Sequence, residues 1–471
     1  MSDRVAAEDV LLFVNAAVTA TGQREFRSSA EEQKLSLGFV HEYVCVNYRP
    51  LYAATLALDI NDHNAALIVE RLLRTPREAA PGEGPLIAAR LAKLPPQRVY
   101  RLFGALRAAG VNNRRTRAIV RDWLAGRDLA HDAVKYRSGL RSAARHAHLP
   151  FPRSGERGAE LGDFLFAPGR RARYAHPTLE AFRRARHEQG ALYELPFTVA
   201  EGFAARHGVP REVFLERMAP RMTRLERLRT RAAEPGTDLS VMPLTRLALY
   251  VLSLPFEERA ARRDELTGAL RAAARRVAGP HAGRWGRVAA VLDDSWSASG
   301  SGMKRRRPLA VALGCHFLLE ALAGPGAYAA HWTSGGRDPL LVRPWGPTPL
   351  GARILDALED APERLVIVSD GWDNAPPGLA GEVLRVWRTR LDPQRRTGVV
   401  HVNPVYDADV FDVRRLAPGV PTAGIRDAED LPALVEIARF AEGREGLPAL
   451  RAYLDSRVEL FLGTAPEEAR A

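Results

Sequence analysis

The sequence predicts an α-helical solenoid followed by an α/β domain with a doubly wound parallel sheet. Over residues 5–149, apolar residues recur at spacings of three and four, which is typical of amphipathic helices. Beyond residue 285, short apolar runs alternate with helical segments, which is the order that a parallel sheet requires. We therefore expect a helical domain over residues 1–278 and an α/β domain over residues 285–471.

The first helices have recognisable starts and stops. Helical patterns cover residues 66–73 and 98–103, and Asn112 or Asn113 is placed to cap a helix from Arg114 to Ala125. Helices of about 12 to 16 residues joined by short turns favour stacked antiparallel pairs. No exact sequence repeat is present, so the prediction of a HEAT-like solenoid depends only on this succession of similar helices and short turns. A plain helical bundle remains the alternative.

The middle of the chain combines a loop with a second helical block. Residues 150–176 are rich in Pro and Gly, so we expect a long loop there. Residues 177–278 again show helical spacing, and residues 279–283 form the linker into the α/β domain.

The α/β domain should contain four strands with helices between them. The apolar runs predict strands over residues 288–292, 327–332, 365–368 and 399–402. The expected helices cover residues 308–322, 352–358 and 381–390, with closing helices over residues 431–440 and 447–454.

Oxygen-bearing side chains stand where three of these segments begin or end. The first strand runs directly into Asp293, Ser295 and Ser297 in a D-x-S-x-S pattern. Thr348 precedes a helix, and Asp370 follows the strand at residues 365–368. Loops at the carboxyl ends of parallel strands meet at one sheet edge, and such hard oxygen ligands suit Mg²⁺. The sequence predicts a metal site at these five residues, although Asp and Ser at strand ends also cap turns and helices.

This order of motifs resembles the metal-ion-dependent adhesion site of von Willebrand factor type A domains, over roughly residues 285–415. The resemblance implies that Ser295, Ser297 and Thr348 contact the metal, while Asp293 and Asp370 reach it through waters. One coordination position would then remain for an acidic group of a partner.

The formal net charge of +12 and the pI of about 10.1 favour a polyanionic partner such as RNA. Codon bias in a GC-rich genome is the alternative source of this charge, because nearly all of it is Arg and the only lysines are Lys34, Lys93, Lys135 and Lys304. The positions of the charges must decide between the two explanations.

Two neighbouring segments concentrate basic residues. Arg114, Arg117 and Arg121 have the spacing of one helical face. The segment 134–149 adds further basic side chains and an aromatic ring, which suit phosphate neutralisation and base stacking. The run Lys304 to Arg307 opens a helix after the metal loop, where cations oppose the helix dipole, and this placement hints at an anionic partner nearby.

A second resemblance covers most of the chain. A Lys135-Tyr136 motif followed by a helix that ends in His148-Leu149, then Met242-Pro243-Leu244-Thr245-Arg246-Leu247 and the metal-site domain, resembles the Ro autoantigen (TROVE) family. The resemblance implies a HEAT-like ring closed by the α/β domain, with 3′ single-stranded ends of defective noncoding RNAs in its hole and small Y-type RNAs on its outer surface. The residues that would line the RNA surface by position are Lys135, Arg137, Arg141 and His148.

The chain departs from that family pattern at two places. The stretch 139–142 looks shortened, and the metal loop continues through an unusual Ala-Ser-Gly-Ser-Gly segment at residues 298–302.

Other features limit the compartment and the chemistry. Cys45 and Cys315 are too few for a disulfide framework or a zinc site. No signal peptide or apolar run of roughly 20 residues is present, so a cytoplasmic protein without a membrane partner is expected. No P-loop, G-x-S-x-G or His-Glu-x-x-His motif supports an enzyme.

The sequence thus favours a protein that binds noncoding RNA, rather than DNA, as a ribonucleoprotein scaffold or RNA quality-control factor. A nuclease or another RNA-processing protein is a candidate partner. The competing interpretation is a von Willebrand type A adaptor, without RNA, that captures an acidic residue of a protein such as an AAA+ ATPase through its metal.

Overall fold

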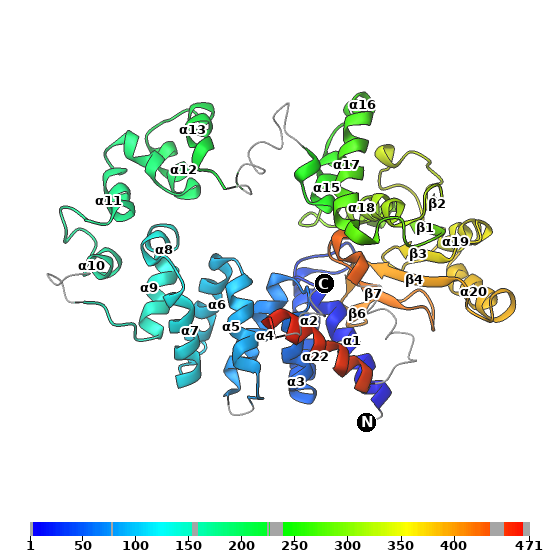
Figure 1. Ribbon diagram of the computed structural model, residues 1–471, viewed down its shortest axis with the longest axis horizontal. Coiled ribbons are helices and arrows are strands. Elements are labelled where there is room, and N and C mark those ends of the chain that lie inside the picture. The colour runs from blue at the N-terminus through cyan, green and yellow to red at the C-terminus, as the bar shows by residue number, and fades with distance from the viewer. Residues whose placement is uncertain are drawn as a thin grey trace. The chain divides into compact units, whose positions relative to one another are not determined.

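The computed structural model describes residues 3–76, 79–152, 159–223, 226, 239–433 and 447–464. The chain forms two compact units, shown in Figure 1. The sheet unit contains Met1–Ala65 and Asp238–Ala471, and the helical unit contains Ala66–Thr237. The expected domain boundary between residues 278 and 285 therefore falls inside the sheet unit.

A five-stranded parallel sheet forms the centre of the sheet unit. Its strand order is β2 (Tyr328–Trp332), β1 (Val288–Leu292), β3 (Arg364–Val368), β4 (Gly398–Asn403) and β7 (Thr422–Gly424). Every neighbouring pair is parallel, which confirms the four predicted strands and their direction. The sequence did not predict β7, because three residues are too few to show an apolar period.

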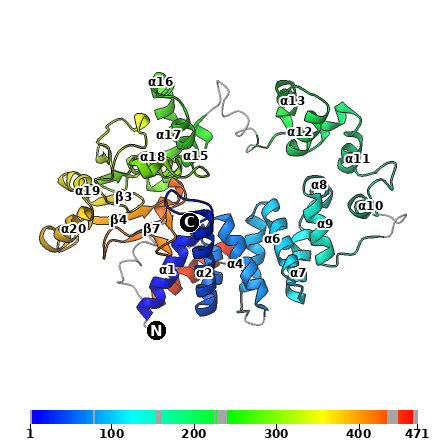
Figure 2. The ribbon, with the colours of Figure 1, turned by 180° about the vertical axis from the view of Figure 1, so that it is seen from behind.

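Helices cover the sheet, as Figure 1 and the view from behind in Figure 2 show. The helices α19 (Leu350–Glu359) and α20 (Leu379–Val386) pack on alternate residues of the strands, including Ala289, Val291 and Ile367. The helix α18 (Arg307–Leu322) is apolar all round because it lies buried between β1 and two further helices. Those two helices are α15 (Leu244–Ser253) and α17 (Arg263–Ala278).

The N-terminal helices belong to the same unit as the sheet. Helices α1 (Asp3–Thr19) and α2 (Ala30–Asn47) pack beside β7 and the small β5 (Tyr406–Asp407) and β6 (Asp412–Val413) pair. Gln33 Nε2 donates to the Tyr406 carbonyl over 3.0 Å, and the Ser36 and Tyr406 hydroxyls lie 2.8 Å apart. The other α-helices that the structure describes in this unit are α3 (Arg49–Ala54), α16 (Phe256–Ala261) and α22 (Leu447–Leu462), and α22 packs on α1 and α3.

The helical unit is a succession of short helices. Its best-predicted helix is α7 (Arg114–Ala125), where Asn113 Oδ1 accepts a hydrogen bond of 2.9 Å from the Thr116 N–H. The others are α4 (Asp62–Arg74), which begins in the sheet unit, α5 (Glu83–Lys93), α6 (Pro96–Ala108), α8 (Leu129–Lys135), α9 (Arg137–His146), α10 (Glu160–Phe166), α11 (Pro177–Arg184), α12 (Phe197–Arg206) and α13 (Arg211–Met218).

The structure corrects the expected loop at residues 150–176 and confirms one of the two expected closing helices. The loop over residues 150–176 contains α10, because the Phe164 ring packs at 5.6 Å from Tyr174 and 5.4 Å from Phe182. The expected helix at residues 431–440 lies mostly outside the described residues, whereas the one at 447–454 is present and extends to Leu462 as α22. Among the described residues, none of the helices has both the length and the apolar character needed to cross a bilayer.

Candidate metal centre and basic helical surface

The candidate metal centre lies where two neighbouring strands end. In the sheet, β1 has β2 on one side and β3 on the other, so the chain order reverses at β1. Ligand sites in open parallel sheets lie at such a switch point, outside the carboxyl ends of the strands. The loops that begin at Asp293 and Ser369 leave β1 and β3 at this point, and Asp293 N donates to the Val368 carbonyl over 2.9 Å.

Four of the five predicted ligands form one buried cluster. Asp293 Oδ1 accepts from the Ser295 N–H over 2.9 Å, and the Ser295 and Ser297 hydroxyl oxygens are 3.2 Å apart. The Ser297 side chain also hydrogen-bonds Asp370. None of the four is more than 8% exposed. The structure thus brings two carboxylates and two hydroxyls together.

The fifth predicted ligand, Thr348, lies on a neighbouring loop. The backbone of this loop pairs with the metal loop, since Trp296 N donates to the Gly346 carbonyl over 3.0 Å. Asn374 holds Thr348 from the other side, accepting from its N–H at 2.7 Å and donating to its carbonyl at 3.2 Å. Within the described residues, no hydrogen bond joins the Thr348 side chain to the other four ligands.

The electrostatics of the cluster favour a bound cation. Burial first and the charge of Asp370 second raise the pKa of Asp293 to about 7. Burial also raises the pKa of Asp370, against the lowering effects of the Ser297 hydrogen bond and of Arg27 and Arg414. Two buried carboxylates that destabilise each other become favourable when a divalent cation lies between them. These oxygen ligands fit a hard ion such as Mg²⁺.

The rim of the centre contains residues that the sequence analysis did not identify. The Trp372 ring lies under two guanidinium groups, with Arg27 at 4.2 Å and Arg414 at 3.7 Å from its centroid. Trp372 follows the Asp370-Gly371 pair directly and could have been found from that position. Arg27 could not, because it comes from the loop between α1 and α2, far away in sequence.

Asp294 is buried beside the centre but has a structural role. Its carboxylate accepts from the Thr333 hydroxyl at 2.8 Å, from the Ser334 N–H at 2.8 Å and from the Ser334 hydroxyl at 2.6 Å. These bonds fix the start of the metal loop on the loop after β2.

The basic run at residues 304–307 is mostly engaged within the sheet unit. Lys304 forms a buried ion pair with Glu25, and Arg307 contacts Asp427 at 3.1 Å. Arg306 donates to the Leu252 carbonyl, and only Arg305 is fully exposed. Most of this run therefore stabilises packing within the sheet unit and does not form a free basic patch.

The positive charge of the chain is concentrated in the helical unit. Residues 66–237 contain 33 Lys and Arg against 17 Asp and Glu, a net charge of +16. The residues of the sheet unit contain 35 basic and 39 acidic side chains, a net charge of −4. A bias that acted on all codons alike would not separate the charges in this way.

Four of the predicted RNA-facing residues are available on the surface of the helical unit. Arg114, Arg141 and His148 are exposed, and Arg117 is half-buried. Among the described residues, no carboxylate pairs with Arg114, Arg117 or Arg141, so these three guanidinium groups can contact phosphates.

The other three predicted residues have partners inside the unit. Arg121 donates to the Ala147 carbonyl over 2.7 Å, at the end of α9. Arg137 donates to the Phe164 carbonyl and lies 4.7 Å from the centroid of its ring, and burial lowers the pKa of its guanidinium group. Lys135 lies 3.9 Å from Glu226. These residues stabilise the packing of α9, α10 and the segments around them.

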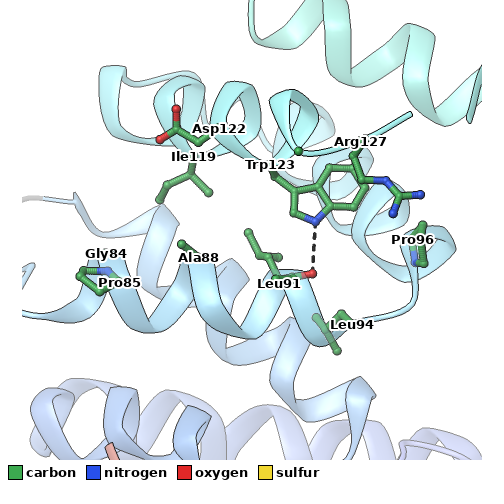
Figure 3. A pocket seen from close by; sticks show the side chains of 12 residues that line it. Gly84, Pro85, Ala88, Leu91, Leu94, Pro96, Ile119, Asp122, Trp123 and Arg127 are labelled. Carbon is green, nitrogen blue, oxygen red and sulfur yellow. Dashed lines mark hydrogen bonds between the residues drawn. The ribbon is translucent and has the colours of Figure 1, made fainter. Parts of the chain in front are cut away.

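The apolar side of α7 borders a cavity of about 580 Å³, which Figure 3 shows. The opposite wall is α5, and the Trp123 indole N–H donates to the Leu91 carbonyl over 3.2 Å across the gap. Ile119 and Trp123 line this cavity, whereas Arg114 and Arg117 do not. Helix α7 therefore lines this cavity with one face and carries Arg114 and Arg117 outside it.

Comparison with models of known protein families gives no match to this chain, and a search of curated proteins gives none either.

Proposed function

We propose that this protein binds noncoding RNA on its helical unit, as a ribonucleoprotein scaffold or RNA quality-control factor. The observation that carries the proposal is the separation of charge, +16 on residues 66–237 and −4 on the rest of the chain. A polyanion that neutralises its phosphates on Arg side chains is attracted to the first unit and not to the second. The exposed Arg114 and Arg141 and the half-buried Arg117 are the first phosphate contacts.

The finer architecture belongs to the same proposal. We interpret the successive short helices as HEAT-like, and the parallel sheet with its D-x-S-x-S loop as a von Willebrand type A domain. The position of Asp293, Ser295 and Ser297 at the switch point of the sheet supports this interpretation. A TROVE-like protein of this kind would hold small Y-like RNAs or single-stranded RNA ends, with an RNA-processing protein such as a nuclease as partner.

The proposed role of the metal centre is to hold Mg²⁺ between Asp293 and Asp370. Bound there, the ion would offer an open coordination position to an oxygen ligand. Ser295, Ser297 and Thr348 would supply neutral oxygens directly, and Asp293 and Asp370 would reach the ion through waters, so the ion would keep positive charge toward an anionic group.

This geometry also favours a second function, which is capture of an acidic protein partner. Arg27 and Arg414 flank Trp372 beside the carboxylate cluster and add positive charge at its rim. An acidic side chain of a partner, for example on an AAA+ ATPase, would bind the metal and these arginines together.

One comparison of variants tests the RNA proposal. We expect the triple change Arg114→Glu, Arg117→Glu and Arg141→Glu to weaken binding of the small RNAs that copurify with the protein by at least about 100-fold. The matched control is Arg275→Glu, Arg337→Glu and Arg390→Glu, which changes the net charge equally on exposed arginines of the sheet unit. Equal loss of affinity in both variants, or in neither, would disprove the proposed surface.

The variant Asp293→Ala separates the two functions. If the protein is an adaptor, capture of its protein partner is lost in this variant. If it is an RNA-binding protein, RNA affinity is retained, because the helical unit carries the phosphate contacts.

A further inference from the structure

A second cavity, of about 320 Å³, lies in the sheet unit between the end of α15, the start of α16 and the loop at residues 342–344. Three arginines line it, Arg259, Arg306 and Arg343. The rest of its wall is largely apolar and includes Phe256 and Leu309. Three cations around an apolar hollow are unusual in a unit whose own net charge is −4.

Arg259 forms the buried floor of this cavity. It is 4% exposed, and its nitrogens donate to the carbonyls of Leu252 and Leu254 at 2.8 and 2.9 Å. Two further bonds of 3.2 Å reach the carbonyls of Leu340 and Val342. Among the described residues no carboxylate pairs with it, and burial together with the nearby Arg306 lowers its pKa. The positive potential of Arg259 therefore extends into the cavity.

The other two arginines retain donors for a ligand. Arg306 donates one N–H to the Leu252 carbonyl. Arg343 is exposed and lies over aromatic rings, at 5.9 Å from the Phe256 centroid and 4.9 Å from that of Trp345. In the described part of the chain, none of the three arginines pairs with an acid.

Two of the acidic side chains near Arg259 in sequence are already engaged. Glu258 and Glu265 both bind Arg262, at 3.0 and 2.8 Å. An external anion would therefore neutralise the positive charge of the arginines that line the cavity.

We propose that this cavity binds a nucleotide, with its phosphate on Arg306 and Arg343 and its base against the apolar wall beside Phe256. Guanidinium groups match phosphate oxygens, aromatic and apolar side chains stack on bases, and the volume is within the range of small-ligand sites. The source of the nucleotide is either a free mononucleotide or the phosphorylated end of an RNA strand.

The cavity shares its walls with the segments that build the metal centre. Arg306 N donates to the Ser299 carbonyl over 2.7 Å, and Trp345 N donates to the Asp294 carbonyl over 2.8 Å. A nucleotide on Arg306 and Arg343 therefore contacts both segments that continue into the metal site. This site is separate from the proposed RNA surface, so its test is independent of the RNA proposal.

Calorimetric titration of the full chain tests the proposal, with 5′-AMP, adenosine and inorganic phosphate as probes. We expect 5′-AMP to bind at least about tenfold more tightly than adenosine, because the phosphate contacts are charge-assisted. Arg343→Ala should weaken 5′-AMP binding by at least about tenfold without unfolding the protein, since Arg343 is exposed and its guanidinium group contacts only rings among the described residues. The variant Arg306→Gln should have the same direction of effect.

The control variant is Arg305→Ala, which removes an exposed neighbouring charge that does not line the cavity. It should leave 5′-AMP affinity unchanged. A 5′-phosphorylated trinucleotide that binds in an Arg343-dependent manner while 5′-AMP does not would identify an RNA end as the source. Absence of binding by both probes, or binding that survives Arg343→Ala and Arg306→Gln, would overturn the proposal.

Discussion

Asn15 and Asp412, which stand 397 positions apart, are joined by a buried hydrogen bond of 2.9 Å from Asn15 Nδ2 to Asp412 Oδ1. The amide oxygen of the same side chain, Asn15 Oδ1, accepts from the Gly424 N–H at 2.9 Å. One side chain of α1 therefore holds both β6 and β7. This contact explains why the first helices belong with the sheet rather than with the helices that follow them.

Removal of the Asn15 amide should destabilise the sheet unit. Asn15→Ala removes one hydrogen-bond donor from the buried Asp412 carboxylate and the acceptor of the buried Gly424 N–H, so we expect the free energy of unfolding to fall by about 2–4 kcal/mol. Denaturant unfolding measures the change. The control is Asn47→Ala, because the Asn47 side chain bond to the Tyr43 carbonyl is exposed. Equal effects of the two substitutions would mean that the bridge contributes little.

Asp412 should make stability depend on pH in an identifiable direction. Burial raises its pKa from 3.8 to about 6, so the folded protein holds its proton more tightly than the unfolded chain does. The contribution of Asp412 is therefore most favourable below pH 3.8 and is lost as the pH rises through 6. The loss is about 3 kcal/mol at most.

The variant Asp412→Asn checks this assignment, because it keeps an acceptor for Asn15 but cannot ionise. Between pH 4 and pH 7 the wild type should lose stability relative to the variant. A difference between the two proteins that does not change with pH would contradict the assignment.

Mg²⁺ should stabilise the protein through the carboxylate cluster. At a free Mg²⁺ concentration 100 times the dissociation constant, the gain is about 2.7 kcal/mol, visible as a rise in Tm that chelation reverses. Asp293→Ala should abolish the rise, and Asp409→Ala, at an exposed position, should keep it. A Tm that responds to Mg²⁺ equally in both variants would locate the ion elsewhere.

Gly371 should be essential for the shape of the metal centre. Its φ is +77°, and a Cβ there would lie 2.6 Å from the Arg414 carbonyl oxygen. Gly378 has a nearly equal φ of +79° but no atom within 4 Å of the added Cβ. Gly378→Ala should therefore cost about 1–2 kcal/mol from backbone strain alone.

Gly371→Ala should cost clearly more, and it should also lower the affinity for Mg²⁺, because Asp370 is its neighbour. Unfolding curves and Mg²⁺ titrations of the two alanine variants provide the comparison. Similar stability and similar affinity in both would show that the contact with Arg414 relaxes without consequence.

The dependence of RNA affinity on salt concentration should show how many arginines contact phosphates. Each phosphate contact adds about 0.7 to 0.9 to the slope of log affinity against log salt concentration. Changing Arg114, Arg117 and Arg141 to Gln should therefore reduce the slope by about 2 to 3. The same change at Arg275, Arg337 and Arg390 should leave the slope unaltered, and a reduced slope there would point to diffuse binding over the whole chain.

Local patterns predicted much of this structure. The apolar runs predicted β1 to β4, and Asn113 predicted the start of α7. Both predictions succeeded because each signal lies within a few neighbouring residues. The cluster of Asp293, Ser295, Ser297 and Asp370 was also predictable, since parallel strands bring their carboxyl ends together. For Thr348, the prediction holds only for its loop, which lies beside the metal loop, because its side chain has no hydrogen bond to the other four residues within the described part of the chain.

Long-range partners were not predictable in the same way. Nothing in the spacing of Arg121 and Arg137 indicates that their guanidinium groups bind the carbonyls of Ala147 and Phe164 rather than solvent or RNA. The hydrogen bonds that join α1 to β6 and β7 come from the Asn15 side chain, which has no periodic pattern around it. The arginine-lined cavity combines α15, α16 and α18 with a loop near residue 343, and only the fold brings these together.

The helical unit is an insertion, because its continuous stretch of chain interrupts a sheet unit built from both ends of the sequence. During synthesis, residues 66–237 can fold as soon as they emerge, whereas α1 and α2 must wait for β6, β7 and α22 before their apolar faces are covered. The apolar faces of α1 and α2 are thus covered only after the chain has returned to the sheet unit beyond residue 237. A circular permutation that joined the two original termini would make the sheet unit continuous and remove this delay.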